Sequence, residues 1–334
     1  MRLLIEKNIP FVQGLLEPYG EVEYLAANAF TPETVKDADA LMVRTRTRCD
    51  AALLEGSRCQ MVATATIGTD HIDLPWCAAH GITVENAPGC NAPAVAQYVF
   101  ASLLKLANRP LSQYRIGIVG VGHVGKIIEQ WARQLDMEVM VCDPPRQQAE
   151  GGDGWSTLAD IAREADIITF HTPLDETTRH MADAEFFASL RRSPIIINSA
   201  RGEVVDNQAL LEALRSGQVH HAVMDCWEGE PAINLELLRH CAIATPHIAG
   251  YSYEGKVRGT RMALDAISRH FGLPHIEMEQ HAPMGAAASV NPKAIARSYD
   301  PAVDTAALKS DPASFESLRN HYNLRHEVHS GKID

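Results

Sequence analysis

Along residues 1–90, short apolar runs alternate with segments whose apolar residues recur at helical spacing. The runs predict strands, and the spaced segments predict helices. We expect the strands at residues 3–5, 22–25, 40–43, 61–64 and 82–84. We expect the helices at residues 10–16, 32–36, 51–55 and 75–80. This alternation is typical of a small α/β unit.

A long apolar helix at residues 91–106 leads into a second, more regular alternation. Its expected strands are residues 116–119, 138–142, 166–170, 194–198, 219–225 and 242–245. Its expected helices are residues 126–135, 157–163, 183–190 and 206–215. Six strands joined by crossover helices predict a doubly wound parallel sheet, which binds ligands at the carboxyl ends of its strands. Another helix is expected after the last strand, at residues 251–271.

The C-terminal tail has a different character. Residues 280–312 are rich in Ala, Pro and Ser and offer few residues for a core. A helix is expected after them, with Asp311 as its N-cap and Pro312 at its first position. Phe315, Leu318 and Tyr322 would lie on one face of this helix.

The turn after the strand at residues 116–119 carries the pattern G-x-G-x-x-G, at Gly120, Gly122 and Gly125. This pattern also occurs in ordinary glycine turns, but here it lies between a predicted strand and a predicted helix, as dinucleotide binding requires. Gly120 permits the tight turn, Gly122 lets the backbone approach a pyrophosphate, and Gly125 lets the helix pack closely. The N-terminus of the helix would then face the anion.

Asp143 follows the next strand, within about 20 residues of the glycine motif. An acid at this place binds the ribose hydroxyls and repels a 2′-phosphate, so we expect NAD as the cofactor rather than NADP. Arg146, close to it in sequence, would instead favour NADP. The two prolines between them are expected to turn the chain away from the site.

Composition narrows the class of protein. At 334 residues the chain should form about two domains. Its formal charge of −12 disfavours binding to nucleic acid or anionic membranes. Its apolar runs are shorter than the roughly 18 residues of a membrane span, and its apolar start is too short for a signal peptide.

The seven cysteines form no C-x-x-C pattern, which favours reduced thiols in a cytoplasmic protein. The 15 histidines show no metal-binding spacing, so we expect no metal.

Three candidate catalytic residues, Arg201, Glu230 and His247, each follow one of the last three predicted strands. Oxidation of a secondary alcohol with NAD needs a base for the hydroxyl proton, and a histidine held by a carboxylate suits that role. An arginine fork suits a substrate carboxylate. Taken singly, Arg201 could cap a helix or form an ion pair in its loop. Glu230 could be a solvated acid in a turn, and His247 could be an imidazole of the core. Their shared position at strand ends favours a catalytic set, with His171 as the alternative base.

These segments resemble the D-isomer-specific 2-hydroxyacid dehydrogenases, over about residues 1–275. The resemblance implies that Arg201, Glu230 and His247 form the catalytic set of an NAD-dependent dehydrogenase. It also implies cofactor contacts from the loops that follow the strands. The full set of expected cofactor contacts is Gly120, Gly122, His123, Val124, Gly125, Asp143, Thr172, Asp225 and Gly250.

The resemblance also implies a domain organisation. A Rossmann-type NAD-binding domain, residues 91–251, would be inserted into a smaller, flavodoxin-like α/β substrate-binding domain. That domain would be discontinuous, made of residues 1–90 plus 252–275. Residues 276–334 would be a shortened C-terminal dimerisation region. The apolar helix that opens the NAD-binding domain is more apolar than one small sheet can cover, which also favours a homodimer.

Within the family, the sequence resembles members whose 2-hydroxy acid carries a phosphate, and this implies substrate contacts by Thr45, Thr66 and Tyr251. A phosphate needs cations, which the basic loop at residues 44–48 and the start of the last long helix supply. The candidates for these contacts are Arg44, Lys256 and Arg258. Two alternatives stay open: another dehydrogenase of the family, such as one acting on 3-phosphoglycerate, and an NAD-sensing, co-repressor-like binding protein.

Overall fold

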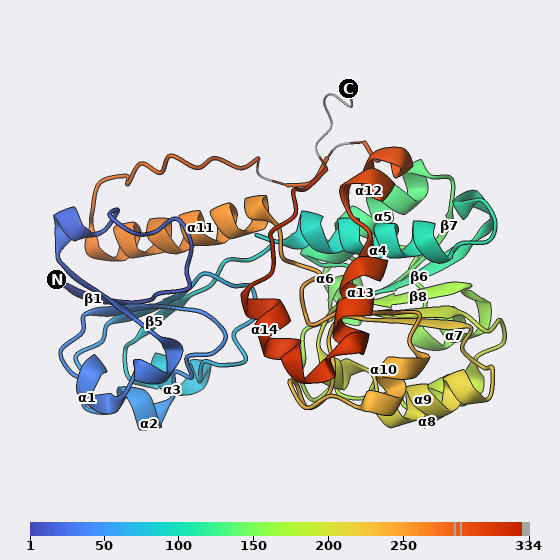
Figure 1. Ribbon diagram of the computed structural model, residues 1–334, viewed down its shortest axis with the longest axis horizontal. Coiled ribbons are helices and arrows are strands. Elements are labelled where there is room, and N and C mark those ends of the chain that lie inside the picture. The colour runs from blue at the N-terminus through green and yellow to red at the C-terminus, as the bar shows by residue number, and fades with distance from the viewer. Residues whose placement is uncertain (284, 288, 329–334) are drawn as a thin grey trace. The chain divides into compact units, whose positions relative to one another are not determined.

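The computed structural model of the chain describes residues 1–283, 285–287 and 289–328 (Figure 1). Its internal contacts divide the chain into two compact units. Among the described residues, unit 1 consists of Met1–Asn91 and Ser252–Gly285, and unit 2 of Ala92–Tyr251 and the tail from Ala286 to residue 328. Unit 1 is therefore assembled from two separate stretches of sequence. Within the described ranges, no helix is both long and apolar enough to cross a membrane.

Unit 1 contains a five-stranded parallel sheet in the order β2-β1-β3-β4-β5. Its strands are β1 (Arg2–Glu6), β2 (Glu21–Leu25), β3 (Ala40–Val43), β4 (Met61–Thr64) and β5 (Thr83–Glu85). The order 2-1-3-4-5 is that of the flavodoxin-like doubly wound fold, which confirms the predicted fold class of this unit.

Alternate residues of the unit 1 strands face two different cores. Leu3 and Ile5 of β1 pack with α11 (Tyr253–Phe271), whereas Leu4 between them packs with helices on the other face. Those helices are α1 (Pro32–Val35), α2 (Ala51–Leu54) and α3 (Leu74–Ala79). Figure 1 shows α11 along one side of the sheet and α1 to α3 along the other. The returning helix is therefore what covers one face of this sheet.

The helix expected at residues 10–16 is wrong, because this stretch forms turns followed by a 3₁₀ helix at Glu17–Tyr19. Phe11 and Gly14 have φ angles of 63° and 86°. A right-handed helix needs negative φ throughout, so these two left-handed residues exclude it. Leu16 is nevertheless fully buried. The apolar spacing therefore reflects burial rather than a helix.

Unit 2 contains a six-stranded parallel sheet in the order β11-β10-β9-β8-β6-β7. Its strands are β6 (Arg115–Val119), β7 (Glu138–Cys142), β8 (Ile167–Phe170), β9 (Ile195–Asn198), β10 (His221–Met224) and β11 (Ile243–Ala244). This confirms the predicted Rossmann-type sheet. The strand order reverses between β6 and β8, and such sheets bind ligands at the carboxyl ends of the strands beside this switch point.

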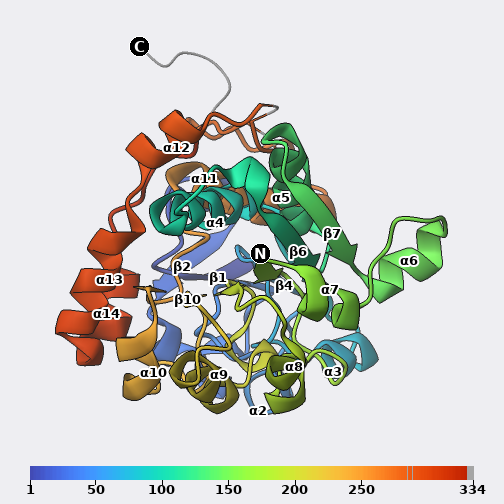
Figure 2. The ribbon, with the colours of Figure 1, turned by 90° about the vertical axis from the view of Figure 1, so that its right-hand side faces the viewer.

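Helices cover both faces of the unit 2 sheet (Figure 2). On β9, Ile195 and Ile197 share a core with α4 (Ala92–Leu106) and α5 (His123–Gln134), and Ile196 faces the opposite layer. That layer contains α7 (Leu158–Glu164), α8 (Ala184–Ser189), α9 (Asn207–Arg215) and α10 (Leu235–His240). The sequence did not predict α10 or α6 (Pro144–Glu150), both of which are short.

The C-terminal tail is not a separate region. Residues 276–285 belong to unit 1, and the described residues from Ala286 onward belong to unit 2. The tail also has more core residues than the sequence suggested, since Ile295 and Leu308 are 1% and 0% exposed. Its helices, drawn in red shades in Figure 1, are α12 (Pro292–Ser298), α13 (Pro301–Ser310) and α14 (Phe315–Asn320). The last is the helix predicted after Pro312, with a 3₁₀ turn in front of it.

The tail helices cover α4. Helix α12 packs against α4, and α13 contacts it as well. Residues 92–103 of α4 are all buried within this one chain. The apolar character of α4 is therefore explained by packing inside unit 2, and it does not by itself support the predicted homodimer.

Candidate active site

The glycine turn after β6 is closed on one side and open on the other. Gly120 has a φ of 86°, and a Cβ there would lie 2.8 Å from the backbone of the loop after β8. A Cβ on Gly125 would overlap the carbonyl oxygen of Gly120, whereas one on Gly122 would meet nothing within 4 Å. Helix α5 starts directly after Gly122, with His123 and Val124 as its first residues. The first N–H groups of a helix have no partner inside it, so this open side suits a pyrophosphate.

Asp143, at the carboxyl end of β7, binds the glycine turn. Its carboxylate accepts hydrogen bonds from the backbone N–H groups of Val121 at 2.8 Å and Arg146 at 3.0 Å. Arg146 forms an exposed ion pair with Glu150 at 2.7 Å and donates from Nη1 to the carbonyl oxygen of Val121 at 3.1 Å, so it lies at the glycine turn and its charge is only partly offset. The two prolines after Asp143 do not turn the chain away, as the sequence had suggested. They begin α6, where a missing N–H costs nothing, and Asp143 is its N-cap.

Glu230 and His247 form a hydrogen-bonded pair. Nδ1 of His247 lies 2.9 Å from Oε2 of Glu230 and 3.0 Å from Oε1. Because a carboxylate only accepts, Nδ1 carries the proton, and Nε2 is the nitrogen that can serve as a base. Glu230 also accepts a hydrogen bond from the backbone N–H of Trp227 at 3.0 Å. His247 has a φ of 58°, a strained conformation that is enriched at functional sites.

Glu230 and His247 each stabilise the charged form of the other. Burial alone would lower the pKa of His247, but Cys226 and Glu230 beside the ring outweigh it and raise that pKa well above its usual value. Burial raises the pKa of the Cys226 thiol itself, so Cys226 acts on the ring through its hydrogen bond, and Glu230 is the charged partner. Burial alone would also raise the pKa of Glu230, but His247, a backbone N–H and Arg319 together lower it. The pair can therefore hold a proton as imidazolium and carboxylate.

Asp225 braces the loop that carries His247. It is 1% exposed, and its carboxylate accepts hydrogen bonds from the Thr245 hydroxyl at 2.6 Å and from the N–H groups of Ile248 at 2.7 Å and Ala249 at 2.9 Å. Both carboxylate oxygens are thus bound by the loop. Three of the roughly four lone-pair sites of this carboxylate are thus occupied by the loop, and the cofactor contact of Asp225 stays a prediction.

The loops of Arg201 and Glu230 are packed against each other. Arg201 follows β9, and Glu230 follows the adjacent β10. Gly202, next to Arg201, lies so close to the peptide between Trp227 and Glu228 that a Cβ would overlap it. Since His247 follows β11, the sheet brings all three candidate catalytic residues to the carboxyl ends of adjacent strands.

The loop after β8 lies against the glycine turn. A Cβ on Gly120 would lie 2.9 Å from the backbone nitrogen of Thr172, which places Thr172 beside the cofactor motif. Gly250 lies in the loop after His247. His171, the alternative base, is bound through Nε2 to the Thr169 hydroxyl at 2.7 Å, and burial lowers its pKa to about 3. A base this weak is unsuited to accepting a hydroxyl proton at neutral pH.

Sequence reasoning missed Arg319, which α14 brings to the catalytic pair. Its Nη1 lies 3.7 Å from Oε2 of Glu230, and its Nε donates a hydrogen bond to the Tyr251 hydroxyl at 3.2 Å. The only signal in the sequence was an arginine on a helix with an apolar face.

One cluster at this pair has the composition of a metal site. Cys226, Glu230 and His247 offer ligand atoms within 4.8 Å of one another. Glu230, however, already accepts two hydrogen bonds, and the Arg319 cation lies beside it. A neighbouring cation opposes the binding of a metal ion, so the cluster is better suited to proton transfer.

Most of the predicted substrate-binding residues lie in unit 1. Thr45 is exposed, and Lys256 is half-buried near the start of α11. Arg44 donates from Nη1 to the carbonyl oxygen of Asn8 at 3.0 Å. The hydroxyl of Thr66 is hydrogen-bonded to that of a neighbouring threonine at 2.7 Å. These contacts anchor the two polar loops of unit 1 from which the side chains project.

Arg258 has a structural role instead. It is 2% exposed and donates to the carbonyl oxygens of Cys90 at 2.7 Å and Pro283 at 2.8 Å. It therefore ties the end of the N-terminal stretch to the stretch after α11. A guanidinium buried among backbone carbonyls does not fit a phosphate contact, so this sequence-based assignment is corrected.

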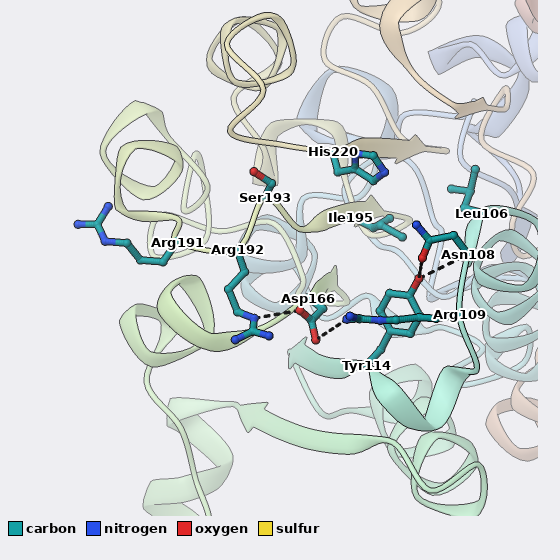
Figure 3. Close-up of a pocket in the computed structure, with 10 residues that line it drawn as sticks. All are labelled: Leu106, Asn108, Arg109, Tyr114, Asp166, Arg191, Arg192, Ser193, Ile195 and His220. Carbon is teal, nitrogen blue, oxygen red and sulfur yellow. Dashed lines mark hydrogen bonds and ion pairs between the residues drawn. The ribbon is translucent and has the colours of Figure 1, made fainter.

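A pocket of about 550 Å³ opens at the amino ends of the unit 2 strands (Figure 3). Asp166 at its centre pairs with Arg109 at 3.2 Å and Arg192 at 2.9 Å. Strands β8, β9 and β10 begin here, whereas Glu230 and His247 follow strand ends. The pocket therefore lies at the opposite edge of the sheet from the catalytic pair.

Comparisons with known proteins agree with the fold and with an NAD-binding domain. The family described as "D-isomer specific 2-hydroxyacid dehydrogenase, NAD binding domain" matches residues 95–249. A D-lactate dehydrogenase from Aquifex aeolicus, solved with NAD and lactic acid, has a TM-score of 0.71 at 23% identity, over 81% of this chain and 96% of that one. An NAD-dependent formate dehydrogenase from Staphylococcus aureus, solved with NAD, has a TM-score of 0.71 at 22% identity, over 85% and 100%. The fold and the site define an NAD-dependent dehydrogenase of the D-isomer-specific 2-hydroxyacid type.

Curated relatives narrow the class further. An erythronate-4-phosphate dehydrogenase of Bacteroides fragilis is 46% identical over 100% of this chain and 99% of its own. Enzymes of the same name from Porphyromonas gingivalis and Edwardsiella ictaluri are 41% and 42% identical, over 96% and 100% of this chain and 92% and 94% of theirs. The chain belongs to the erythronate-4-phosphate dehydrogenase family.

Proposed function

We propose that this protein oxidises 4-phospho-D-erythronate to (R)-3-hydroxy-2-oxo-4-phosphooxybutanoate with NAD, as a step of pyridoxal 5′-phosphate (vitamin B6) biosynthesis. The observation that carries the proposal is the 2.9 Å contact between His247 and Glu230 at the carboxyl edge of an NAD-binding sheet. The choice of substrate rests on the relatives, which are 40–46% identical and named for it.

In this proposal, Nε2 of His247 accepts the proton of the substrate's 2-hydroxyl group. At the glycine turn, bound NAD would supply the acceptor for the hydride of C2, the carbon that carries this hydroxyl group. Glu230 keeps the other ring nitrogen protonated and stabilises the imidazolium that forms. Arg201 pairs with the substrate carboxylate through two parallel hydrogen bonds, which sets the position of the reacting carbon.

The cofactor contacts are proposed at the glycine turn. The first N–H groups of α5, from His123 and Val124, would bind the pyrophosphate beside Gly122. The carboxylate of Asp143 would accept hydrogen bonds from the ribose hydroxyl groups. Its carboxylate already accepts two backbone N–H groups, but two oxygens offer about four lone-pair sites and leave room for these contacts.

The substrate phosphate is assigned to Arg44 and Lys256, with Thr45, Thr66 and Tyr251 as further substrate contacts. Charge-assisted contacts of this kind contribute roughly 1.5–3 kcal/mol each. Since about 1.4 kcal/mol corresponds to a factor of ten, two of them should favour the phosphorylated acid by at least about a hundredfold.

The test is the rate of NADH formation with a panel of 2-hydroxy acids. We expect kcat/KM for 4-phosphoerythronate to exceed that for erythronate, 3-phosphoglycerate and D-lactate. A preference for 3-phosphoglycerate would establish the alternative dehydrogenase. NADH binding without turnover of any acid would establish a sensor instead of an enzyme.

We also propose a cytoplasmic homodimer. The resemblance to dimeric family members supports the dimer. The seven cysteines are free and buried, which suits a reducing compartment. A monomer mass in sedimentation at micromolar concentration would contradict the dimer.

A further inference from the structure

Arg319 is a nearly buried cation beside the pair of Glu230 and His247. It takes no part in the proton and hydride transfers that we propose for this site. Its side chain is 8% exposed, and that of Glu230 is 16% exposed. The 3.7 Å between Nη1 and Oε2 is an ion-pair distance rather than a direct hydrogen bond. Because little water reaches either group, their attraction is screened less than that of a surface pair.

A second arginine of the tail holds the loop beside this contact. Arg325 is 8% exposed and donates to the carbonyl oxygens of Ile248 at 3.1 Å and Tyr251 at 3.0 Å, and also to that of Ala249. The same guanidinium stacks on the ring of Tyr299 at 4.4 Å. The stretch after α14 is thus fastened to the loop that follows His247, and this fixes where Arg319 lies.

We propose that Arg319 is a positioning residue for the reaction: held in place by the tail, it orients Glu230 and Tyr251 and draws part of the Glu230 charge away from His247. The inference rests on the proposed function, in which His247 is the base. It assigns a catalytic purpose to a segment for which the sequence suggested only dimerisation.

The direction of the effect follows from the charges. Oxidation needs neutral His247, and Glu230 favours the protonated ring. A positive charge beside Glu230 opposes that protonation. It therefore lowers the pKa of His247 and increases the fraction of neutral base. Removing the positive charge should therefore leave more His247 protonated at a given pH and slow oxidation near neutral pH.

Other ionisable groups also face this pair. His247 faces Cys226 and Asp225 as well as Glu230, and Arg319 also faces Glu316 and Tyr251. Cys226 has a raised pKa and stays a neutral thiol, and Asp225 is bound by the loop. A double-mutant cycle can therefore isolate the contribution that passes through Glu230.

The experiment compares Arg319→Gln, Arg319→Lys and the unmodified protein in pH profiles of kcat/KM for oxidation of 4-phosphoerythronate. We expect Arg319→Gln to move the acid limb upward by about half to one pH unit and to lower kcat/KM at pH 7 by about three- to tenfold. Arg319→Lys keeps the charge and should keep the limb in place. Arg297→Gln, which removes an exposed cation from α12 of the same tail, is the matched control and should change neither quantity.

The coupling to Glu230 provides the second arm. In a Glu230→Gln background, Arg319→Gln should no longer move the acid limb. An equal shift in both backgrounds would overturn the proposal, as would a rise in KM with the limb unmoved. An equal fall in thermal stability and activity for the Gln and Lys variants would also overturn it, because it would indicate a merely structural role.

A third measurement does not depend on turnover. In protein labelled with ¹³C-histidine, the ring signal of His247, assigned with a His247→Asn variant, should titrate at higher pH in Arg319→Gln. An unmodified protein inactive on every acid would contradict the proposed function, while this titration would still decide the role of Arg319. An unchanged titration would overturn it.

Discussion

His247 and Glu230 share a hydrogen bond of 2.9 Å, but solvent reaches them unequally: the histidine side chain is 29% exposed and the carboxylate 16%. The ring is therefore open to a substrate on one side and held by a shielded acceptor on the other. Such an arrangement keeps the tautomer constant while the outer nitrogen gains and loses a proton.

The first prediction concerns the base. His247→Gln should lower kcat for oxidation by about 10²–10⁴-fold, because that is the usual contribution of a positioned general base. The dissociation constant of NADH should stay the same, since the glycine turn is untouched. Stopped-flow rates and NADH fluorescence titrations measure the two quantities. His240→Gln, an exposed histidine on α10, is the control, and an unchanged kcat in His247→Gln would show that the base lies elsewhere.

The second prediction concerns pH. Glu230 raises the pKa of His247, so Glu230→Gln should lower that pKa and move the acid limb of the oxidation profile to lower pH. Oxidation should then extend to more acid conditions, while kcat falls because the imidazolium has lost its stabilising partner. The pH profile of kcat/KM for Glu230→Gln and for the unmodified protein shows in which direction the acid limb moves. A limb that moves upward would contradict the pairing.

The third prediction concerns the cofactor. The unmodified protein should prefer NAD to NADP, and Asp143→Ala should narrow the difference by weakening NAD, since the ribose would lose its acceptor. The same change removes the N-cap of α6, at a cost of about 0.5–2 kcal/mol. Asp300→Ala, which removes an N-cap on α13, controls for that effect. Equal catalytic efficiency with both cofactors in the unmodified protein would refute the assignment.

The fourth prediction separates two cations of α11 that lie two positions apart. Lys256→Ala should raise KM for 4-phosphoerythronate and leave KM for NAD and the thermal midpoint unchanged. Arg258→Ala should instead lower the thermal midpoint, because it leaves buried carbonyl oxygens without their donor. Steady-state kinetics and thermal unfolding of both variants distinguish the roles. A normal KM in Lys256→Ala would place the phosphate elsewhere.

The sequence by itself determined the features whose signals are local. Buried parallel strands such as β9 are short apolar runs, and a turn that needs left-handed backbone and close packing needs glycine, so β6, Gly120 and α5 could be recognised together. Residues that follow parallel strands meet at one edge of the sheet. This is why the sequence alone was enough to group Arg201, Glu230 and His247.

Only the tertiary structure decided what depends on contacts between distant parts of the chain. The spacing of Leu16 and its neighbours resembled a helix, but left-handed residues fold them into the core as turns. Arg258 has the charge of a phosphate ligand, but its carbonyl partners, 168 and 25 residues away in sequence, hold it inside unit 1. Arg319 meets Glu230 because α14 packs within the core of unit 2 and Arg325 binds the loop after His247. Such contacts arise from packing in three dimensions, and packing between distant segments leaves no period, spacing or motif along the chain.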